Sequence, residues 1–204
     1  MPEVRQYRKT DRDAVGDICV RTADNGGDSR SIYPDLELMP SIFAYPYVDL
    51  EPELAFVLDD GGQAVGYVLA CADTPSFVRR FRTEWIPSLA DRYPAPTTPP
   101  TTPTEQMIAL LHNPERLVIP EVAAYPAHLH IDLLPPYQRS GHGRALMSRL
   151  LTTLASQGIP AIHLCMLTTN TKARAFYDRL SFHHIPVPDV DVVTYLGRST
   201  TNGS

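Results

Sequence analysis

The 204-residue chain has little of several features that mark specialised classes of protein. Its three cysteines are odd in number and lack Cys-x-x-Cys spacing, which excludes a disulfide framework and a zinc knuckle. Its longest apolar stretch, residues 64–72, is far short of the roughly 18 residues that a membrane span needs, and residues 1–10 contain no signal-peptide core. The net charge is −5, whereas a general nucleic-acid binder needs a dense basic face. We therefore expect a cytoplasmic protein with buried cysteines and with neither membrane nor nucleic acid as a partner.

The remaining composition is that of an ordinary globular protein, with 43% hydrophobic and 20% charged residues. A chain of this length can bury one sizeable core, so we expect residues 1–204 to form a single domain. The charge is uneven: residues 1–60 have thirteen acidic against six basic side chains, while residues 138–179 have six basic side chains against Asp178 alone. One half suits a cation and the other an anion, unless both are merely solvated faces.

In the amino-terminal region, the alternation in residues 4–7 predicts a short strand. Thr10 and Asp13 have the spacing of a capping box, which predicts a helix from there to about residue 21. The glycines and prolines of residues 25–52 leave room only for short helical pieces, so this segment is interpreted as a covering loop region.

The middle of the chain contains a predicted hairpin and a proline-rich connector. Two β-rich runs, 53–58 and 63–71, are joined by Asp-Asp-Gly-Gly, which favours a tight turn. A helix is expected at 77–89, with Trp85 on its apolar face. The prolines and threonines around 93–104 predict an exposed extended connector, followed by a short helix at about 105–112.

The last third of the sequence predicts a regular alternation of elements. We expect strands at 127–134 and 161–167, helices at 141–157 and 171–180, and a final strand pair within 182–196. A strand, helix, strand order implies a parallel crossover, whereas the earlier hairpin is antiparallel. The result is a mixed α/β sheet.

The loop Gln138-Arg139-Ser140-Gly141-His142-Gly143 is the sharpest chemical signal. Glycines let the backbone approach a ligand, and successive N–H groups at a helix start attract an anion such as phosphate. The loop lacks the Gly-Lys-Ser/Thr of a P-loop and the third glycine of a dinucleotide fingerprint. On these residues alone, the alternative is a tight strand-to-helix turn that needs glycine for its geometry.

A second motif follows, with Asn170, Ala173, Phe176 and Tyr177 at the spacing Asn-x-x-Ala-x-x-Phe-Tyr. Together with Gln-x-x-Gly-x-Gly at 138–143, it resembles the GNAT family of acetyl-CoA-dependent N-acetyltransferases. A broader resemblance, to the acetyltransferase-like carboxy-terminal domain of O-GlcNAcase and its free-standing bacterial relatives, covers nearly the whole chain. It rests on the segments YRKTD, DICVRTADNGGD, PYVDLEPELAFVLDD, GYVLACADT, EWIPSLADRYP and YPAHLHIDLLP.

This resemblance implies a GNAT fold, in which the fourth and fifth strands are parallel but splayed and helices cover both faces of the sheet. Pro135 and Pro136 lack N–H donors, so we expect them to end the pairing of these two strands. The family's usual Gly-Phe after the second motif is Ser181-Phe182 here, which affects packing more than chemistry. Some O-GlcNAcase-linked members resemble pseudoenzymes with an eroded cofactor loop, but the loop of this chain is intact.

The resemblance implies acetyl-CoA as the acyl donor and assigns residues to it. Arg139, Arg144 and either Lys172 or Arg174 offer charge for the adenosine phosphate, and Tyr177 is the expected acid that protonates the departing thiolate; by itself, Tyr177 also fits a packing role. The expected cofactor-binding residues are Leu133, Leu134, Gln138, Arg139, Ser140, Gly141, His142, Gly143, Arg144, Asn170, Ala173 and Phe176.

His128, His130 and Asp132 alternate along the strand 127–134 and therefore share one of its faces. Three readings stay open: a substrate site or proton relay, a metal site, or a structural set whose members satisfy one another. We take His130 and Asp132 as catalytic candidates and His128, Asp73 and Trp85 as acceptor-site candidates, with no metal. Asp73 could equally cap the following helix.

The sequence thus predicts an acetyl-CoA-dependent N-acetyltransferase in which a primary amine attacks the thioester directly. The insert 74–125 is longer than a connector requires and is expected to act as a lid. The alternative is a catalytically inactive acyl-CoA-binding or protein-interaction module; a nucleotide-phosphate binder is disfavoured by the missing lysine. The acceptor is an unidentified small-molecule or protein amine, and the protein is expected to be a monomer or homodimer.

Overall fold

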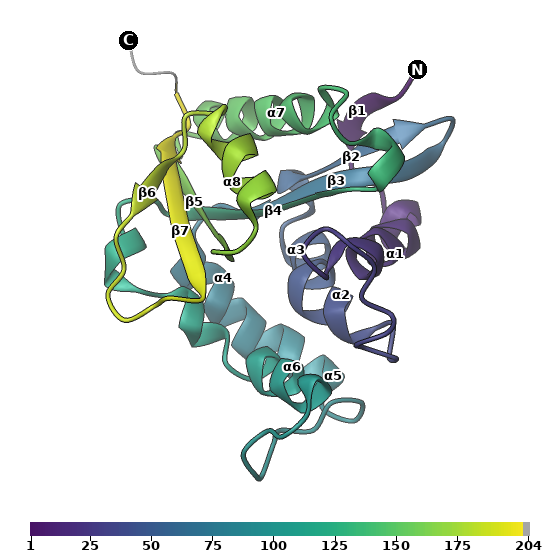
Figure 1. The fold of residues 1–204 in the computed structure, drawn as a ribbon, viewed down its shortest axis with the longest axis vertical. Helices are drawn as coiled ribbons and strands as arrows, with labels where there is room; N and C mark the ends of the chain where they lie inside the picture. The colour runs from purple at the N-terminus through teal and green to yellow at the C-terminus, as the bar shows by residue number, and fades with distance from the viewer. Residues whose placement is uncertain (202–204) are drawn as a thin grey trace.

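Seven strands form one mixed sheet in the computed structural model, which describes residues 1–201 (Figure 1). The spatial order is β1-β2-β3-β4-β5-β7-β6, and only the β4–β5 pair is parallel. The mixed α/β sheet predicted from the sequence is confirmed. The strands are β1 (Glu3–Gln6), β2 (Ala55–Asp60), β3 (Gln63–Cys71), β4 (Ala127–Leu133), β5 (Ala161–Leu167), β6 (His183–Ile185) and β7 (Val193–Ser199).

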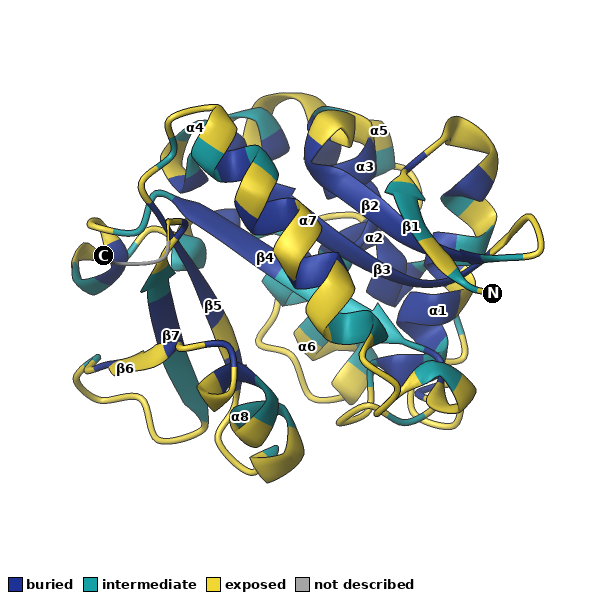
Figure 2. Cartoon of the chain, turned by 90° about the horizontal axis from the view of Figure 1, so that it is seen from above, coloured by how far each residue is buried: buried dark blue, intermediate teal, exposed yellow. Residues whose placement is uncertain are grey.

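Helices cover both faces of this sheet. Figure 1 shows α7 on one face of β1–β4, with α1, α2 and α3 on the other. Along α7, buried and exposed residues alternate with the helical period, so one stripe packs on the sheet (Figure 2). The helices are α1 (Arg12–Thr22), α2 (Leu38–Phe43), α3 (Tyr45–Leu50), α4 (Thr74–Arg80), α5 (Ile86–Leu89), α6 (Pro103–Leu111), α7 (His142–Ser156) and α8 (Thr171–Asp178). Within the described residues, none of them is both long and apolar enough to cross a membrane.

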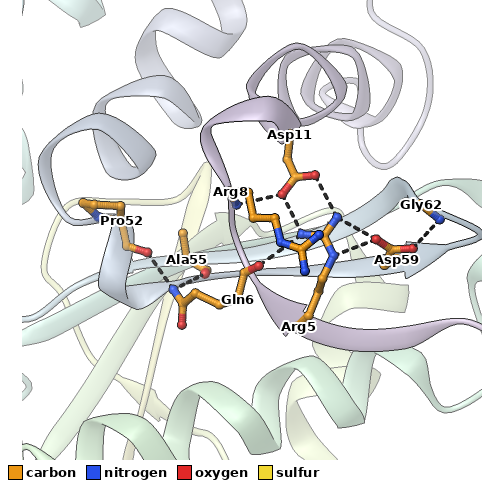
Figure 3. A network of polar contacts seen from close by, with 8 residues as sticks. All are labelled: Arg5, Gln6, Arg8, Asp11, Pro52, Ala55, Asp59 and Gly62. Atoms are coloured by element: carbon orange, nitrogen blue, oxygen red, sulfur yellow. Dashed lines mark hydrogen bonds and ion pairs between the residues drawn. The ribbon is translucent and has the colours of Figure 1, made fainter.

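The predicted hairpin is confirmed: β2 and β3 pair antiparallel across a turn at Gly61 and Gly62, which have φ of 65° and 93°. An ion network joins this hairpin to β1 and to the 3₁₀ turn Lys9–Asp11 that precedes α1 (Figure 3). The Arg5 guanidinium donates to the Asp11 carboxylate at 2.7 and 2.8 Å and to Asp59 Oδ2 at 2.6 Å.

The predicted capping box at Thr10 and Asp13 is wrong. A 3₁₀ turn occupies Lys9–Asp11, and α1 begins only at Arg12. The Asp11 side chain stabilises the start of this turn, because its carboxylate accepts from the Arg8 N–H at 2.7 Å.

The segment 25–52 is more than the covering loop that its prolines suggested. It contains α2 and α3, whose side chains enter the core. Pro40 and Pro46 stand in the first turns of these helices, where a backbone N–H has no helical partner in any case. Two short helices therefore form, and they bring buried aromatic side chains under the sheet.

The helix expected at 77–89 begins three residues earlier, at Thr74, and is interrupted by a π-helical turn at Phe81–Trp85 before α5. The connector at 94–102 is exposed and irregular, as predicted, and α6 follows it. In the last third, the expected strands and helices agree with β4, α7, β5 and α8 to within about two residues, and the final pair is β6 with β7.

Candidate cofactor and acceptor site

β4 and β5 separate after two residue pairs. Ala127 pairs with Ile162 and His128 with His163, and beyond these pairs the strands diverge (Figures 1 and 2). The prediction that Pro135 and Pro136 end this pairing is wrong, because the last pair is His128 with His163, well before Pro135. β5 instead stays paired with β7 along its whole length and follows that strand away from β4. The result is a gap between β4 and β5, here called the strand gap.

One backbone edge of β4 faces the strand gap. The Leu134 N–H donates to the Val65 carbonyl of the hairpin side at 3.0 Å. Because successive residues of a strand direct their hydrogen-bonding groups to opposite edges, those of Ile131 and Leu133 face the gap. The Leu133 carbonyl there accepts from Gln138 Nε2 at 2.9 Å.

Leu134, one of the expected cofactor-binding residues, has both backbone groups engaged within the protein. Its N–H belongs to the β3 side, and its carbonyl accepts from the Tyr137 N–H at 2.9 Å. Sequence alone could not decide which of two adjacent residues faces the gap, because this depends on the register with β3.

The loop at 138–144 presents a row of unused backbone donors. In residues 1–201, no acceptor is found for any of the six N–H groups from Arg139 to Arg144, and the first helical bond of α7 runs from Ala145 N to Gly141 O. Gly141 has a φ of 85°, and no atom lies within 4 Å of where its Cβ would stand. Arg139 is also left-handed, with a φ of 60°. This open row of donors at a helix start suits a phosphate group.

The second motif docks α8 against this loop. The Asn170 side chain caps α8 by accepting from the Ala173 N–H at 3.0 Å. The Phe176 ring lies on Gly143, where an added Cβ would be 3.1 Å from Phe176 Cε2. Asn170 and Phe176 thus have a visible function in placing the loop, whatever contact they make with a cofactor.

Tyr177 lies on the same helix with its ring buried between Phe176 and Phe182. Its hydroxyl donates to no acceptor in the described part of the chain, and it is not among the buried polar atoms that lack a partner, so it reaches open space. Burial, with a smaller contribution from the charge of Asp132, raises the pKa of Tyr177. The hydroxyl is therefore protonated, has no acceptor among residues 1–201 and lies near Asp132.

Asp132 is partly exposed on β4, and its Oδ2 accepts from the Tyr67 hydroxyl at 2.7 Å. Burial raises the pKa of this carboxyl to about 6. Asp132 thus changes charge close to neutral pH, as functional carboxylates often do.

The two histidines of β4 differ in access. His128 is 4% exposed, and both ring nitrogens are engaged: Nε2 with the Tyr47 hydroxyl at 2.7 Å and Nδ1 with Thr74 Oγ1 at 2.8 Å. His130 is partly exposed, and its Nε2 lies 3.1 Å from the same Tyr47 hydroxyl. Burial lowers the pKa of both imidazoles, that of His130 to about 4. The predicted direct contact of His128 with an acceptor does not fit this enclosed position.

Two other acceptor-site candidates serve the protein itself. Asp73 caps α4 by accepting from the Ser76 N–H at 2.9 Å. Trp85 is 8% exposed, and its indole N–H donates to the Ser41 carbonyl at 2.8 Å, so it packs the insert against α2.

The cysteine prediction is correct for Cys19 and Cys71, but Cys165 is exposed on β5. In residues 1–201, no group of three or more His, Cys, Asp or Glu side chains is placed to hold a metal ion.

Sequence reasoning missed Tyr47 and Tyr67. Tyr67 stands opposite Asp132 in the antiparallel β3–β4 pair, but the sequence predicted neither that pairing nor its register. Tyr47 gave no signal, because it lies in the segment interpreted as a loop and is separated from His128 by 81 residues.

The model of the acetyltransferase (GNAT) family matches residues 26–182. The chain belongs to the GNAT acetyltransferase family. A solved structure of a protein named SsHAT is 62% identical, covers 98% of this chain and 99% of its own, and superposes with a TM-score of 0.96.

Protein O-GlcNAcase of Mus musculus is 26% identical over 202 residues, which are 96% of this chain. The chain spans only 22% of the length of that relative. YncA of Salmonella typhimurium, a putative acetyltransferase solved with its cofactor acetyl-CoA, is 14% identical with a TM-score of 0.55, over all of this chain and 96% of its own, and so shares the fold.

Proposed function

We propose that this GNAT protein is an acetyl-CoA-dependent N-acetyltransferase that transfers the acetyl group to a primary amine by direct attack. The observation that carries the proposal is the row of six unused N–H groups at residues 139–144, beside the strand gap. Backbone donors at a helix start bind a pyrophosphate, and a gap with a free strand edge accepts an amide-containing chain as an extra strand. Membership of the family and the acetyl-CoA in the YncA structure support the same cofactor.

The residues present fit acetyl-CoA. The loop 139–144 would hold the pyrophosphate, and the gap-facing backbone of Ile131 and Leu133 would pair with the pantetheine amides. Arg139, Arg144 and Lys172 are exposed around the loop and offer charge for the adenosine phosphate, whereas Arg174 already pairs with Asp178 at 2.8 Å. When bound, the thioester supplies the activated acetyl group.

The chain's own side chains would handle the protons. The amine must be neutral to attack, so a cationic acceptor first has to lose a proton. Asp132 would attract the ammonium form, and His130 would receive its proton. The Tyr177 hydroxyl, which has no acceptor among residues 1–201, would protonate the departing thiolate.

Thermal unfolding with and without acetyl-CoA tests the cofactor assignment. Acetyl-CoA at 100 times its Kd should stabilise the wild type by about 2.7 kcal/mol, a Tm increase of about 5 to 10 °C for a chain of this size. Gly141→Asp should abolish the increase, because it places a side chain and a negative charge where the pyrophosphate would bind.

Gly158→Asp is the matched control. Gly158 has a φ of 75° and equally open surroundings, but it lies at the other end of α7, so it adds similar backbone strain away from the loop. Absence of a Tm increase in the wild type, or an equal loss of the increase in both variants, would contradict the assignment. A screen of amines for release of free thiol from acetyl-CoA then tests catalysis, and cofactor binding without turnover would favour the inactive module.

A further inference from the structure

Four side chains form an unbroken row of hydrogen bonds beside the strand gap. His130 Nε2 lies 3.1 Å from Tyr47 Oη, which lies 2.7 Å from His128 Nε2. His128 Nδ1 lies 2.8 Å from Thr74 Oγ1, which donates to the Pro126 carbonyl at 2.8 Å. We call His130, Tyr47, His128 and Thr74 the imidazole relay.

The interior of the relay is closed to water. Tyr47, His128 and Thr74 are 2%, 4% and 3% exposed. The Phe77 ring stacks on Tyr47 at 4.5 Å and meets His128 edge-on at 5.5 Å, which walls off the middle of the row. His130, at one end, is partly exposed, and Thr74, at the other, lines a cavity, so a proton can enter or leave the row only at these two ends.

The hydrogen bonds assign a direction to the relay. A carbonyl only accepts, so the Thr74 hydroxyl uses its proton on Pro126 and offers lone pairs to His128. His128 then carries its proton on Nδ1, shared between Thr74 Oγ1 at 2.8 Å and Cys71 Sγ at 3.0 Å, and accepts at Nε2 from the Tyr47 hydroxyl. Tyr47 in turn accepts from His130 Nε2–H, which leaves the His130 Nδ1 with an unprotonated lone pair.

The Thr74 end of the relay meets a cavity. Thr74 lines a cavity of about 120 Å³ with Asp73, Tyr125, His163 and apolar side chains of residues 117–123. This volume is enough for several water molecules, and although most of its lining is apolar, Asp73, Thr74 and His163 carry polar groups that can contact them. The relay thus runs from the partly exposed His130 to the cavity that Thr74 lines.

We propose that the imidazole relay carries the acceptor's proton from the strand gap to this cavity. The proposal rests on the N-acetyltransferase function proposed above. His130 Nδ1 takes a proton from the acceptor ammonium, and His130 releases its Nε2 proton to Tyr47. The Tyr47 proton moves to His128 Nε2, and the His128 Nδ1 proton moves to Thr74. The Thr74 hydroxyl proton leaves its hydrogen bond with the Pro126 carbonyl and passes to a water molecule in the cavity. One proton enters, one leaves, and all four side chains end neutral, with both imidazoles in the other tautomer; the same shift in reverse or a ring rotation restores them before the next turnover.

The electrostatic surroundings favour a transfer that stores no charge. The groups that face the two imidazoles are Arg116 from the 3₁₀ turn Pro114–Leu117, His163 from β5 and the Cys71 thiol from β3. Arg116 and His163 disfavour an imidazolium, and burial keeps the Cys71 thiol protonated by raising its pKa. A concerted transfer of protons between neutral side chains avoids forming the imidazolium that this environment disfavours.

Steady-state kinetics with acetyl-CoA and a primary amine test the relay. Tyr47→Phe and Thr74→Val should each lower kcat at least tenfold below the amine's pKa, with little change in KM for acetyl-CoA. The loss should shrink at higher pH, where the amine arrives neutral, and Thr74→Ser should restore the rate. Tyr93→Phe is the control, because it also removes the hydroxyl of a buried tyrosine, one that donates to Asp35 at 2.9 Å.

A second readout needs no turnover. In ¹⁵N NMR of the free wild type, His128 should carry its proton on Nδ1 and His130 on Nε2; protonation of His130 at Nδ1 would overturn the relay even if Tyr47→Phe failed to fold. If the wild type is active and neither Tyr47→Phe nor Thr74→Val is slower than Tyr93→Phe, the relay is overturned while the proposed function stands. Wild type that binds acetyl-CoA but acetylates no amine would overturn the proposed function and, with it, the relay's role.

Discussion

Asp132→Asn should make the folded protein more stable at neutral pH while impairing acetyl transfer. Burial raises the pKa of Asp132 to about 6, against roughly 3.9 in an unfolded chain. Between about pH 4 and 6, the folded state therefore binds more protons than the unfolded state, and stability falls as pH rises through this window. Above pH 6 the full cost of the buried charge remains.

The size of the effect follows from that difference in pKa. About two pH units correspond to about 3 kcal/mol, an upper bound because Asp132 is partly exposed to screening water. The asparagine carbonyl can still accept from the Tyr67 hydroxyl, so no buried donor loses its partner. The variant should match the wild type near pH 4 and exceed its Tm by up to about 6 to 12 °C at pH 7.5.

Thermal melts of the wild type and Asp132→Asn from pH 4 to 8, with kinetics on the same preparations, test this prediction. Asp60→Asn is the matched control, because Asp60 also accepts a tyrosine hydroxyl, that of Tyr137 at 2.7 Å, but lies at the hairpin end. We expect kcat/KM for a cationic acceptor to fall at least tenfold in Asp132→Asn only. A variant that is less stable at pH 7.5, or a difference that does not change with pH, would refute the electrostatic reasoning; normal kinetics would remove Asp132 from the acceptor site.

Tyr177→Phe should bind acetyl-CoA almost as the wild type does but turn over about 10²- to 10⁴-fold more slowly. Its stability should change by less than about 1 kcal/mol, since the hydroxyl has no partner in residues 1–201 to strand; unchanged kcat would leave Tyr177 a packing residue. Arg5→Met should cost on the order of 3 kcal/mol at pH 7, measured by urea unfolding, because it leaves Asp11 and Asp59 without their shared cation. Arg5 helps to hold the pKa of both carboxyls below the usual range, so this loss should shrink as pH falls below 4. An equal cost in Arg21→Met, which breaks an exposed ion pair, would show that the Arg5 network is not special.

Several parts of the molecule were predictable because short stretches of sequence determine them. The hairpin needs only two adjacent glycines with positive φ between β-rich runs, and α7 needs only a leucine stripe between Gly141 and Gly158. The phosphate-type loop follows from the same local logic. Backbone freedom and side-chain periodicity act over a few residues, so the sequence displays them directly.

Tertiary structure alone decided which atoms of the candidate site are available. The register of β4 on β3 engages the Leu134 N–H with Val65 and directs the backbone groups of Leu133 to the strand gap. The pairing of β5 with β7 along its whole length draws β5 away from β4, so the gap begins after His128. Such outcomes depend on contacts between residues far apart in the chain.

The same reason separates the two histidines. The sequence predicts that His128 and His130 share a face of β4, and nothing in the strand itself distinguishes them. The distinction comes from Tyr47, carried under the sheet by a short helix 81 residues before His128, which encloses one imidazole and leaves the other at the gap. Burial and hydrogen-bond partners are set by this long-range packing, and the pKa of each group follows from them.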